Sequence, residues 1–423
     1  MNAEAWMAGK KKKAVICWEL GAGLGHLNPI YQVAEELIRR QYDVWVLCKD
    51  LGSVHRVFKN VAADPDTRRG TDGKPGPEVG AGSKAGLQIL QGPNLSPLAP
   101  QQAKSALCFA DLLWTVGYHN PQQLKTVVMA WRALFDLIAP DVVFYDHSPT
   151  ALLASADYSF KKVYLGSTFS CPPSSYPMGL FDPAAMQQAK AAEDQVMDVI
   201  NSVNDSLGLP EIKQLQNLFD YYDYKIFTTV PNLDHYRGRE VSKDEFFVSV
   251  DSFHVEKQVE WPAAGKTKVF GYLKSGQYLK KVLSYLIKSQ CCTCLYIDGR
   301  FEIKQALPPN IKLINYPVSM PSVVESADVV LSNANLNTVI YLADKPVKQM
   351  VIPLSVEQGM LARTLVEKKL AAWLNPDTAA SVEELTESVI SGNKFVVGKA
   401  ERDGVGEQKS AGELLGLALD VVL

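Results

Sequence analysis

The chain has 423 residues, of which 47 % are hydrophobic and 21 % are charged. This length predicts two domains, and the composition lets each of them bury a core of its own. The formal net charge of −3 does not suggest the concentrated basic face that nucleic acid or an anionic membrane demands, and the one basic run, residues 10–13, reads as a solvated tail, so we expect neither partner.

We expect a cytoplasmic protein without a membrane span. No stretch approaches the roughly 20 apolar residues of a span, and the apolar run 14–17 is too short for a secretory signal. The seven cysteines are scattered mostly through apolar runs, which fits reduced, packed thiols. Cys291, Cys292 and Cys294 lack a second pair of ligands, so we expect no metal site. The oligomeric state does not follow from these features.

The first segment of the chain predicts a βαβ unit. Residues 13–18 read as a buried strand, the glycine-rich turn Gly21–Gly25 follows, and residues 42–48 read as a second strand. Between the strands a helix is expected, with Asn28 placed to cap it and Pro29 at its first position. Strand, helix and strand within about 35 residues imply a parallel sheet.

The rest of the first domain, which we place at residues 1–255, continues this pattern. Residues 64–86 are rich in glycine, proline and charge, and we expect a mobile surface loop there. Helices are expected at 121–138 and 186–207, and further strands at 141–145, 162–165 and 225–229.

A second α/β series follows a linker at residues 261–265, and we place this second domain at residues 266–400. Residues 401–423 are expected to add a C-terminal helix. The fold class is therefore α/β, with two Rossmann-like parallel sheets in series. Strands of the second sheet are expected at 269–273, 292–297, 311–314, 329–331 and 349–352, with a helix between most of them.

His26 follows the glycine turn, at the edge of the first sheet where open α/β sheets bind ligands. The spacing G-x-G-x-G-H is one residue out from the dinucleotide fingerprint G-x-G-x-x-G, which disfavours an NAD-dependent oxidoreductase. A neutral imidazole at this edge can act as a general base. The spacing alone also allows a structural histidine.

Asp146 ends another strand of the same sheet and should point toward the same edge as His26. A carboxylate that accepts the imidazole Nδ1–H fixes the tautomer and makes the ring a stronger base. The alternative is that Asp146 caps the next helix. His147 is expected to face away and pack.

A polar loop in the second domain, residues 332–338, lies between a strand and a helix that starts near Thr338. Exposed backbone N–H groups at such a helix start can bind an anion. Glu357 and Gln358 follow the next strand and could bind the hydroxyls of a sugar. A capped helix and a solvated Glu–Gln pair are the alternative.

Three stretches carry motifs that belong together in one family. Residues 25–29 have the form G-H-x-x-P, residues 140–146 form a strand that ends in aspartate, and residues 333–358 end in P-L-x-x-E-Q. Together they resemble the UDP-glycosyltransferase superfamily (glycosyltransferase family 1) in its bacterial form. The resemblance covers nearly the whole chain and implies a GT-B fold, with two Rossmann-like domains facing across a cleft. It also implies that the C-terminal helix crosses back to the first, acceptor-binding domain.

The resemblance implies an inverting transfer from a UDP-sugar or dTDP-sugar to a hydroxyl of a small-molecule or lipid-like acceptor. His26 would be the catalytic base, oriented by Asp146, and neither a cofactor nor a metal would be needed. Tyr316 would stack on the nucleotide base. The resemblance and the sheet topology together assign donor binding to Gly25, Lys274, Tyr316, Asn333, Asn337, Thr338, Glu357 and Gln358.

Departures from the family pattern concern the donor side. Asn333 stands where the family has a histidine on the donor diphosphate, and Tyr341 stands in place of a glutamate that binds the ribose. Because an amide carries no charge, we expect Lys274 to compensate for Asn333. These departures leave two alternatives open, a nucleotide-sugar-binding protein without turnover and a GT-B nucleotide-sugar epimerase.

Overall fold

A computed structural model describes residues 11–21, 23–58, 86–249, 257–263, 267–276, 278–288, 291–299, 301–302, 306–374 and 410–423. The chain divides into two compact units. The first comprises Met1–Thr228, Tyr236–Val250 and Lys409–Leu423, and the second comprises Thr229–His235 and Asp251–Gln408. The loop expected at 64–86 lies outside the described residues except for Gly86, as do residues 375–409 of the expected second domain and C-terminal segment.

The first unit contains a parallel sheet of seven strands in the order β3-β2-β1-β4-β5-β6-β7. Alternate residues of β1 face two separate cores, so helices must cover both faces of the sheet. The strands are β1 (Lys13–Trp18), β2 (Asp43–Cys48), β3 (Leu87–Gln91), β4 (Val142–Asp146), β5 (Lys161–Gly166), β6 (Tyr224–Phe227) and β7 (Glu245–Phe247).

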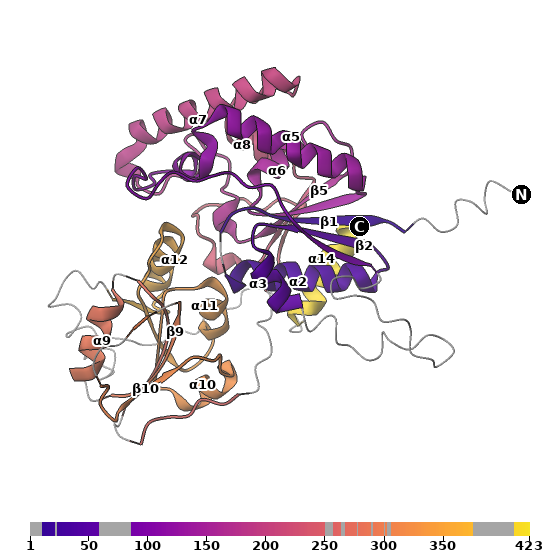
Figure 1. The fold of residues 1–423 in the computed structure, drawn as a ribbon. Coiled ribbons are helices and arrows are strands. Elements are labelled where there is room, and N and C mark those ends of the chain that lie inside the picture. The colour runs from indigo at the N-terminus through magenta and orange to yellow at the C-terminus, as the bar shows by residue number, and fades with distance from the viewer. Residues whose placement is uncertain are drawn as a thin grey trace, which may run out of the picture. The chain divides into compact units, whose positions relative to one another are not determined.

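Helices cover the two faces of this sheet separately (Figure 1). One face carries α2 (Leu24–Arg39), α3 (Leu51–Phe58) and α14 (Ala411–Val422). The other carries α4 (Phe109–Leu113), the π-helical turn η3 (Trp114–Tyr118), α5 (Pro121–Ile138), α6 (Pro149–Ala154), α7 (Met186–Leu207) and α8 (Gln216–Phe219). Short 3₁₀ turns are η4 (Thr168–Ser170), η5 (Pro183–Ala185) and, in the second unit, η6 (Pro231–Leu233).

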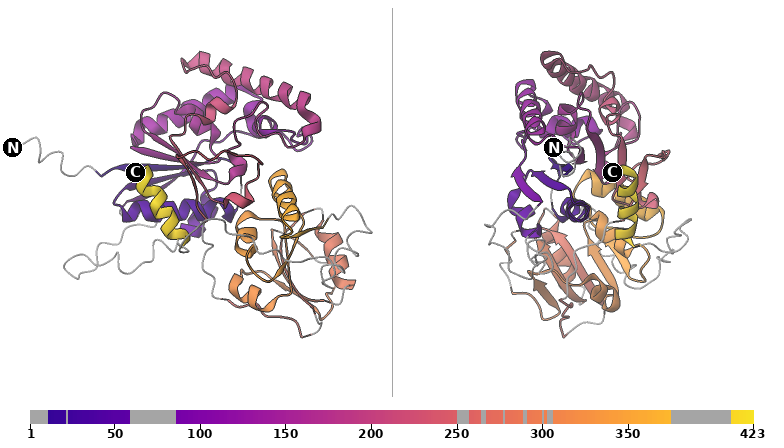
Figure 2. Two further views of the ribbon diagram at one scale, coloured as in Figure 1. Left: turned by 180° about the vertical axis from the view of Figure 1, so that it is seen from behind. Right: turned by 90° about the vertical axis from the view of Figure 1, so that its right-hand side faces the viewer.

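The C-terminal helix α14 packs in the first unit, beside α2 (Figure 2). Ser410 and Glu413 form a capping box at its start. Arg40, the C-cap residue of α2, donates to the Gly416 carbonyl at 3.1 Å and to Asp420 at 2.6 Å. Lys161 donates to the Val422 carbonyl. Hydrogen bonds from two elements therefore fix the helix to this unit, in addition to its buried apolar face.

The second unit contains a parallel sheet of six strands in the order β10-β9-β8-β11-β12-β13. If the strands of each sheet are counted along the chain, both sheets have the order 3-2-1-4-5-6, and the first sheet adds a seventh strand at its edge. The prediction of two Rossmann-like parallel sheets is therefore confirmed. Helix α9 (Leu279–Lys288) packs on one face, and α10 (Met320–Ser326), α11 (Leu336–Leu342) and α12 (Val356–Glu367) pack on the other. The strands are β8 (Lys268–Lys274), β9 (Cys292–Asp298), β10 (Ile311–Ile314), β11 (Val329–Ser332), β12 (Lys348–Val351) and β13 (Ala372–Trp373).

The predicted start of the helix after β1 is wrong. Helix α2 begins at Leu24 rather than after Asn28, so His26 lies in its first turn and Pro29 lies inside it. A proline lacks the N–H that would bond four residues back, which here leaves the Gly25 carbonyl without its helical donor. Only one hydrogen bond near the helix end is lost, and the helix tolerates it.

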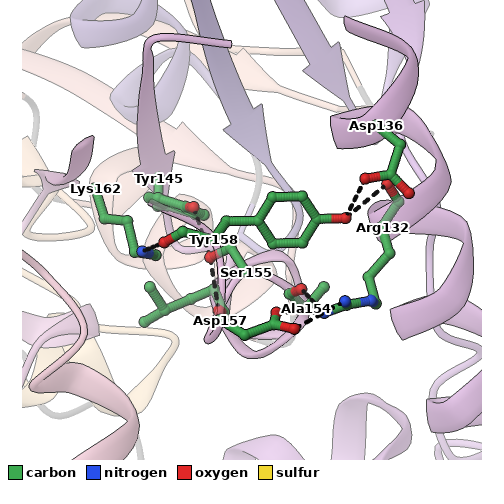
Figure 3. Close-up of polar contacts among 9 residues, drawn as sticks. Arg132, Asp136, Tyr145, Ala154, Ser155, Asp157, Tyr158 and Lys162 are labelled. Carbon is green, nitrogen blue, oxygen red and sulfur yellow. Dashed lines mark hydrogen bonds and ion pairs between the residues drawn. The ribbon is translucent and has the colours of Figure 1, made fainter. Parts of the chain in front are cut away.

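A polar cluster fastens the turn after α6 to α5 (Figure 3). Arg132 binds both carboxylate oxygens of Asp157, at 2.6 and 3.0 Å, and the Ala154 carbonyl at 3.0 Å. The Tyr158 hydroxyl donates to Asp136 at 2.6 Å. The bidentate pair is partly exposed and contributes at most about 1 kcal/mol. The position of the pair is more important than its energy, because Arg132 and Asp157 fix the C-terminal end of α6, the helix that follows Asp146.

Candidate functional site

His26 and Asp146 lie side by side at the carboxyl edge of the first sheet. Trp18 and Asp146 are register partners at the ends of β1 and β4, and His26 is in the first turn of the helix that follows β1. The imidazole Nδ1 lies 2.9 Å from the Asp146 carboxylate oxygen. The Asp146 side chain is 1 % exposed and that of His26 is 20 % exposed.

This pairing selects one form of the imidazole. A carboxylate can only accept, so Nδ1 carries the proton and Nε2 keeps its lone pair. The carboxylate is buried, which strengthens its interaction with the ring relative to water. The arrangement can therefore present Nε2 as a proton acceptor in a fixed orientation.

Two aromatic rings stack with the imidazole of His26. The Trp18 ring is stacked at a centroid distance of 5.9 Å, and the His147 ring is stacked at 6.3 Å. The expectation that His147 faces away is therefore wrong, because its ring is stacked with that of His26; the His147 backbone is left-handed, with φ +42°. Burial, aided by His26 and Lys49, lowers the pKa of His147 from 6.5 to about 3, so this neighbour stays neutral.

Two glycines leave the space that the pair occupies. Gly21 has φ +78°, and a Cβ at this position would overlap the imidazole Nε2 of His26. Gly166, with φ +157°, ends β5, where a Cβ would lie 3.2 Å from the Asp146 carboxylate. A Cβ on Gly25 would meet nothing within 4 Å. The glycine that the pair requires for space is therefore Gly21 and not Gly25, which stands in the first turn of α2.

At the carboxyl edge of the second sheet, Asn333 is bound into the fold. Its side chain is 2 % exposed, accepts the Lys274 backbone N–H at 2.7 Å and donates to the Ile352 carbonyl at 2.8 Å. The amide thus links the ends of β8, β11 and β12. Lys274 and Asn333 line a small hollow at this edge, together with Leu273, Gly276, Tyr278, Leu279, Val282, Ile352 and Leu354.

Gln358 and Glu357 stand in the first turn of α12 and differ in their contacts. The Gln358 amide accepts the Leu354 N–H at 2.7 Å and donates to Asn335 at 3.2 Å, so it joins the loops after β11 and β12. The Glu357 carboxylate is 38 % exposed and lies 3.9 Å from Nε2 of the buried His235. Of the two, Glu357 has the more accessible polar group.

The remaining residues that were predicted to bind the donor lie in two further segments of this unit. Asn337 and Thr338 are half-buried in the first turn of α11, a helix of seven residues. Tyr316 follows β10, and the Lys257 ammonium lies 3.3 Å from the centre of its ring. One face of this ring is thus occupied by a cation.

Within the described ranges, no group of three or more His, Cys, Asp or Glu side chains is placed to hold a metal ion. In the same ranges no helix is long and apolar enough to cross a membrane. All seven cysteines are buried and free. Glu19, a buried acid beside the glycine turn, was missed by the sequence reasoning, although an acidic residue directly after an apolar strand is a visible signal.

No family model matches the sequence, and no curated protein matches it by sequence. Solved structures match its fold along almost the whole chain. The glycotransferase of kitacinnamycin has a TM-score of 0.64 at 15 % identity, covering 98 % of this chain and 95 % of that chain. CalG4, the calicheamicin glycosyltransferase, has 0.62 at 16 %, covering 97 % and 98 %. Acinetobacter baumannii MurG has 0.53 at 13 %, covering 97 % and 99 %. The fold class of the chain is therefore GT-B.

Proposed function

We propose that the chain is an inverting glycosyltransferase that moves a sugar from a nucleotide-diphospho-sugar to an acceptor hydroxyl. The observation that carries the proposal is the His26–Asp146 pair, 2.9 Å between Nδ1 and Oδ1, at the ligand-binding edge of a GT-B sheet. A buried carboxylate that orients an imidazole is an arrangement that supports general-base catalysis.

In this mechanism His26 Nε2 takes the proton of the acceptor hydroxyl. The acceptor oxygen forms a bond to the anomeric carbon on the face opposite the leaving group, and the bond from that carbon to the diphosphate breaks. The nucleoside diphosphate leaves with the bonding electrons, and the configuration at the anomeric carbon is inverted. Asp146 stays ionised and stabilises the imidazolium that forms.

The second unit would bind the donor, with its diphosphate near the hollow that Lys274 and Asn333 line. The Asn333 amide is already bonded within the sheet, so we assign the main diphosphate contact to the Lys274 ammonium, helped by Asn337 and Thr338. Glu357 would bind sugar hydroxyls, with Gln358 holding the loop beside it. Tyr316 would stack the base on the face that Lys257 leaves open.

A panel of UDP-sugars and dTDP-sugars, incubated with hydroxylated small-molecule and lipid-like acceptors, tests this proposal. Mass spectrometry should detect an acceptor that has gained one sugar, and the anomeric coupling constant of the product should show inversion. Donor binding without any product or donor hydrolysis would instead support a nucleotide-sugar-binding protein without turnover. That alternative rests on Asn333 and on Tyr341, the residue in place of the ribose-binding glutamate. A new nucleotide-sugar formed without acceptor would identify an epimerase.

A further inference from the structure

Glu19 is a buried acid next to the His26–Asp146 pair that the proposed chemistry does not use. It directly follows β1, and its side chain is 2 % exposed. One carboxylate oxygen, Oε2, accepts the backbone N–H groups of Thr150 at 3.0 Å and Ala151 at 3.3 Å. The other oxygen, Oε1, has no hydrogen-bond partner among the described residues. Burying a carboxyl group that has one unbonded oxygen costs free energy, so we expect this side chain to have a specific role.

The two hydrogen bonds of Glu19 join the two segments that carry the pair. Glu19 opens the loop that continues through Gly21 toward His26. Thr150 and Ala151, four and five residues after Asp146, lie in the first turn of α6. A further hydrogen bond joins the same two segments, because the Leu20 N–H donates to the His147 carbonyl at 3.0 Å. The strand register brings the ends of β1 and β4 together, and these bonds fix the loops beyond those ends.

The charged and titratable groups around Glu19 come from four segments: β1, the residue after β2, η3 and the stretch between α8 and β6. Burial raises its pKa to about 7, while the hydrogen bonds from Thr150 and Ala151 and the Lys49 charge oppose that rise. Cys17, Tyr118 and Tyr222 also interact with its charge. Ionised or protonated, the carboxyl keeps an oxygen that can accept both N–H groups. The hydrogen bonds between Glu19 and α6 therefore do not depend on the charge of the carboxyl group.

Glu193 in α7 offers a matched comparison in the same unit. It is fully buried and also accepts two backbone N–H groups, those of Met178 at 2.6 Å and Leu215 at 3.2 Å. Burial raises the pKa of this carboxyl too. The segments that Glu193 joins carry neither His26 nor Asp146. The two acids thus make the same number of backbone bonds, and they differ in what those bonds hold.

We propose that Glu19 is a positioning residue, which holds the loop leading to His26 against the start of α6 and thereby sets the contact between His26 and Asp146. Its effect on rate rests on the proposed function, but its effect on the geometry of the pair does not. The proposal therefore has two readouts, the titration of the His26 ring and the rate of sugar transfer.

The test compares Glu19→Ala, Glu19→Gln and Glu193→Ala in the full chain. The midpoint of the His26 ring titration is followed by NMR, with the signal assigned by its loss in His26→Ala. Glu19→Ala should lower this midpoint by about 0.5–1 pH unit, because the ring loses its carboxylate contact. It should also lower kcat by about 10–100-fold with little change in donor KM. Glu19→Gln keeps an accepting oxygen and should stay within about threefold of the wild type in kcat.

Glu193→Ala should reduce thermal stability and leave the His26 midpoint in place. An unchanged midpoint in Glu19→Ala, or an equal shift in Glu193→Ala, would reduce Glu19 to an ordinary core acceptor and overturn the proposal. If Glu19→Ala does not fold, Glu19→Asp replaces it, since its shorter side chain cannot reach both N–H groups and should shift the midpoint in the same direction. A shifted midpoint in a protein that transfers no sugar would support the positioning role and reject the proposed function.

Discussion

The two sheets share one winding order, yet the polar residues at their carboxyl edges are used differently. In the first unit, His26 and Asp146 bind each other, and glycines leave room for their side chains. In the second unit, the side chains of Asn333 and Gln358 bind neighbouring loops of the fold itself. The comparison shows that a residue can occupy the position that a sequence motif predicts while its side chain forms hydrogen bonds within the fold instead of facing a ligand.

Around the first edge, Gly21→Ala is expected to have the largest effect of the supporting positions. The new methyl group would overlap His26 Nε2, and φ +78° costs a non-glycine residue about 1–2 kcal/mol. Displacing the imidazole by about 1 Å can cost about 100-fold in rate. Gly52→Ala in α3 is the control, since its Cβ would make only an ordinary 3.4 Å contact. Equal kcat values for the two variants would show that the space at Gly21 is not needed.

Asp146→Asn should come next, with kcat lowered about tenfold or more. The amide cannot supply the negative charge that stabilises the imidazolium, so the pH–rate profile should also move to lower pH. The measurement is kcat between pH 5 and 9, with Asp198→Asn, at the exposed surface of α7, as the control. An unchanged profile would leave Asp146 with only a structural role.

At the second edge, Lys274→Ala and Asn333→Ala should separate binding from structure. Lys274→Ala should weaken donor binding about tenfold, the value of one charge-assisted hydrogen bond to the diphosphate. Asn333→Ala should mainly lower the free energy of unfolding, by about 1–3 kcal/mol, because the Lys274 N–H and the Ile352 carbonyl lose their partner. Calorimetry and denaturant unfolding measure the two effects. Unaltered donor affinity in Lys274→Ala would contradict the compensation idea.

The last effect concerns neither rate nor donor binding but the pH dependence of stability at the first edge. The pKa of His147 is lowered from 6.5 to about 3, so the folded protein binds fewer protons there than the unfolded chain. The contribution of the neutral His147 ring to the free energy of unfolding is present above pH 6.5 and is lost as pH falls from 6.5 toward 3. His147→Asn removes the titrating ring and tolerates the left-handed backbone. Between pH 7 and 4 this variant should lose less stability than the wild type, and equal losses would contradict the assignment.

The fold was predictable because strand and helix periodicities are strong in both sheets. Two short elements were not predicted: β7 has three partly buried residues and no alternating pattern, and α3 is only eight residues long although its apolar residues repeat at helical spacing. The start of α2 was misplaced because the Asn28-Pro29 dipeptide is a typical helix start, and the chain enters the helix earlier through a glycine turn that carries no capping side chain.

The proximity of His26 and Asp146 follows from strand order, because Asp146 ends β4 and His26 is in the first turn of the helix that follows the neighbouring strand β1. The hydrogen bonds of the Asn333 side chain within the second sheet could not be predicted from strand order. Whether a small amide at a strand end faces a ligand or bonds the next strand depends on side-chain geometry that spacing does not encode. The same holds for Glu19, whose partners lie 131 and 132 residues away along the chain.

The central claim is that His26 removes the acceptor proton, and His26→Ala tests it most directly. Transfer is measured at saturating donor and acceptor, with donor affinity measured separately and with His55→Ala, an exposed histidine of α3, as the control. We predict that kcat falls by about 10²–10⁴-fold in His26→Ala while the donor Kd stays close to that of the wild type. A His26→Ala protein that keeps most of the wild-type kcat would contradict the account.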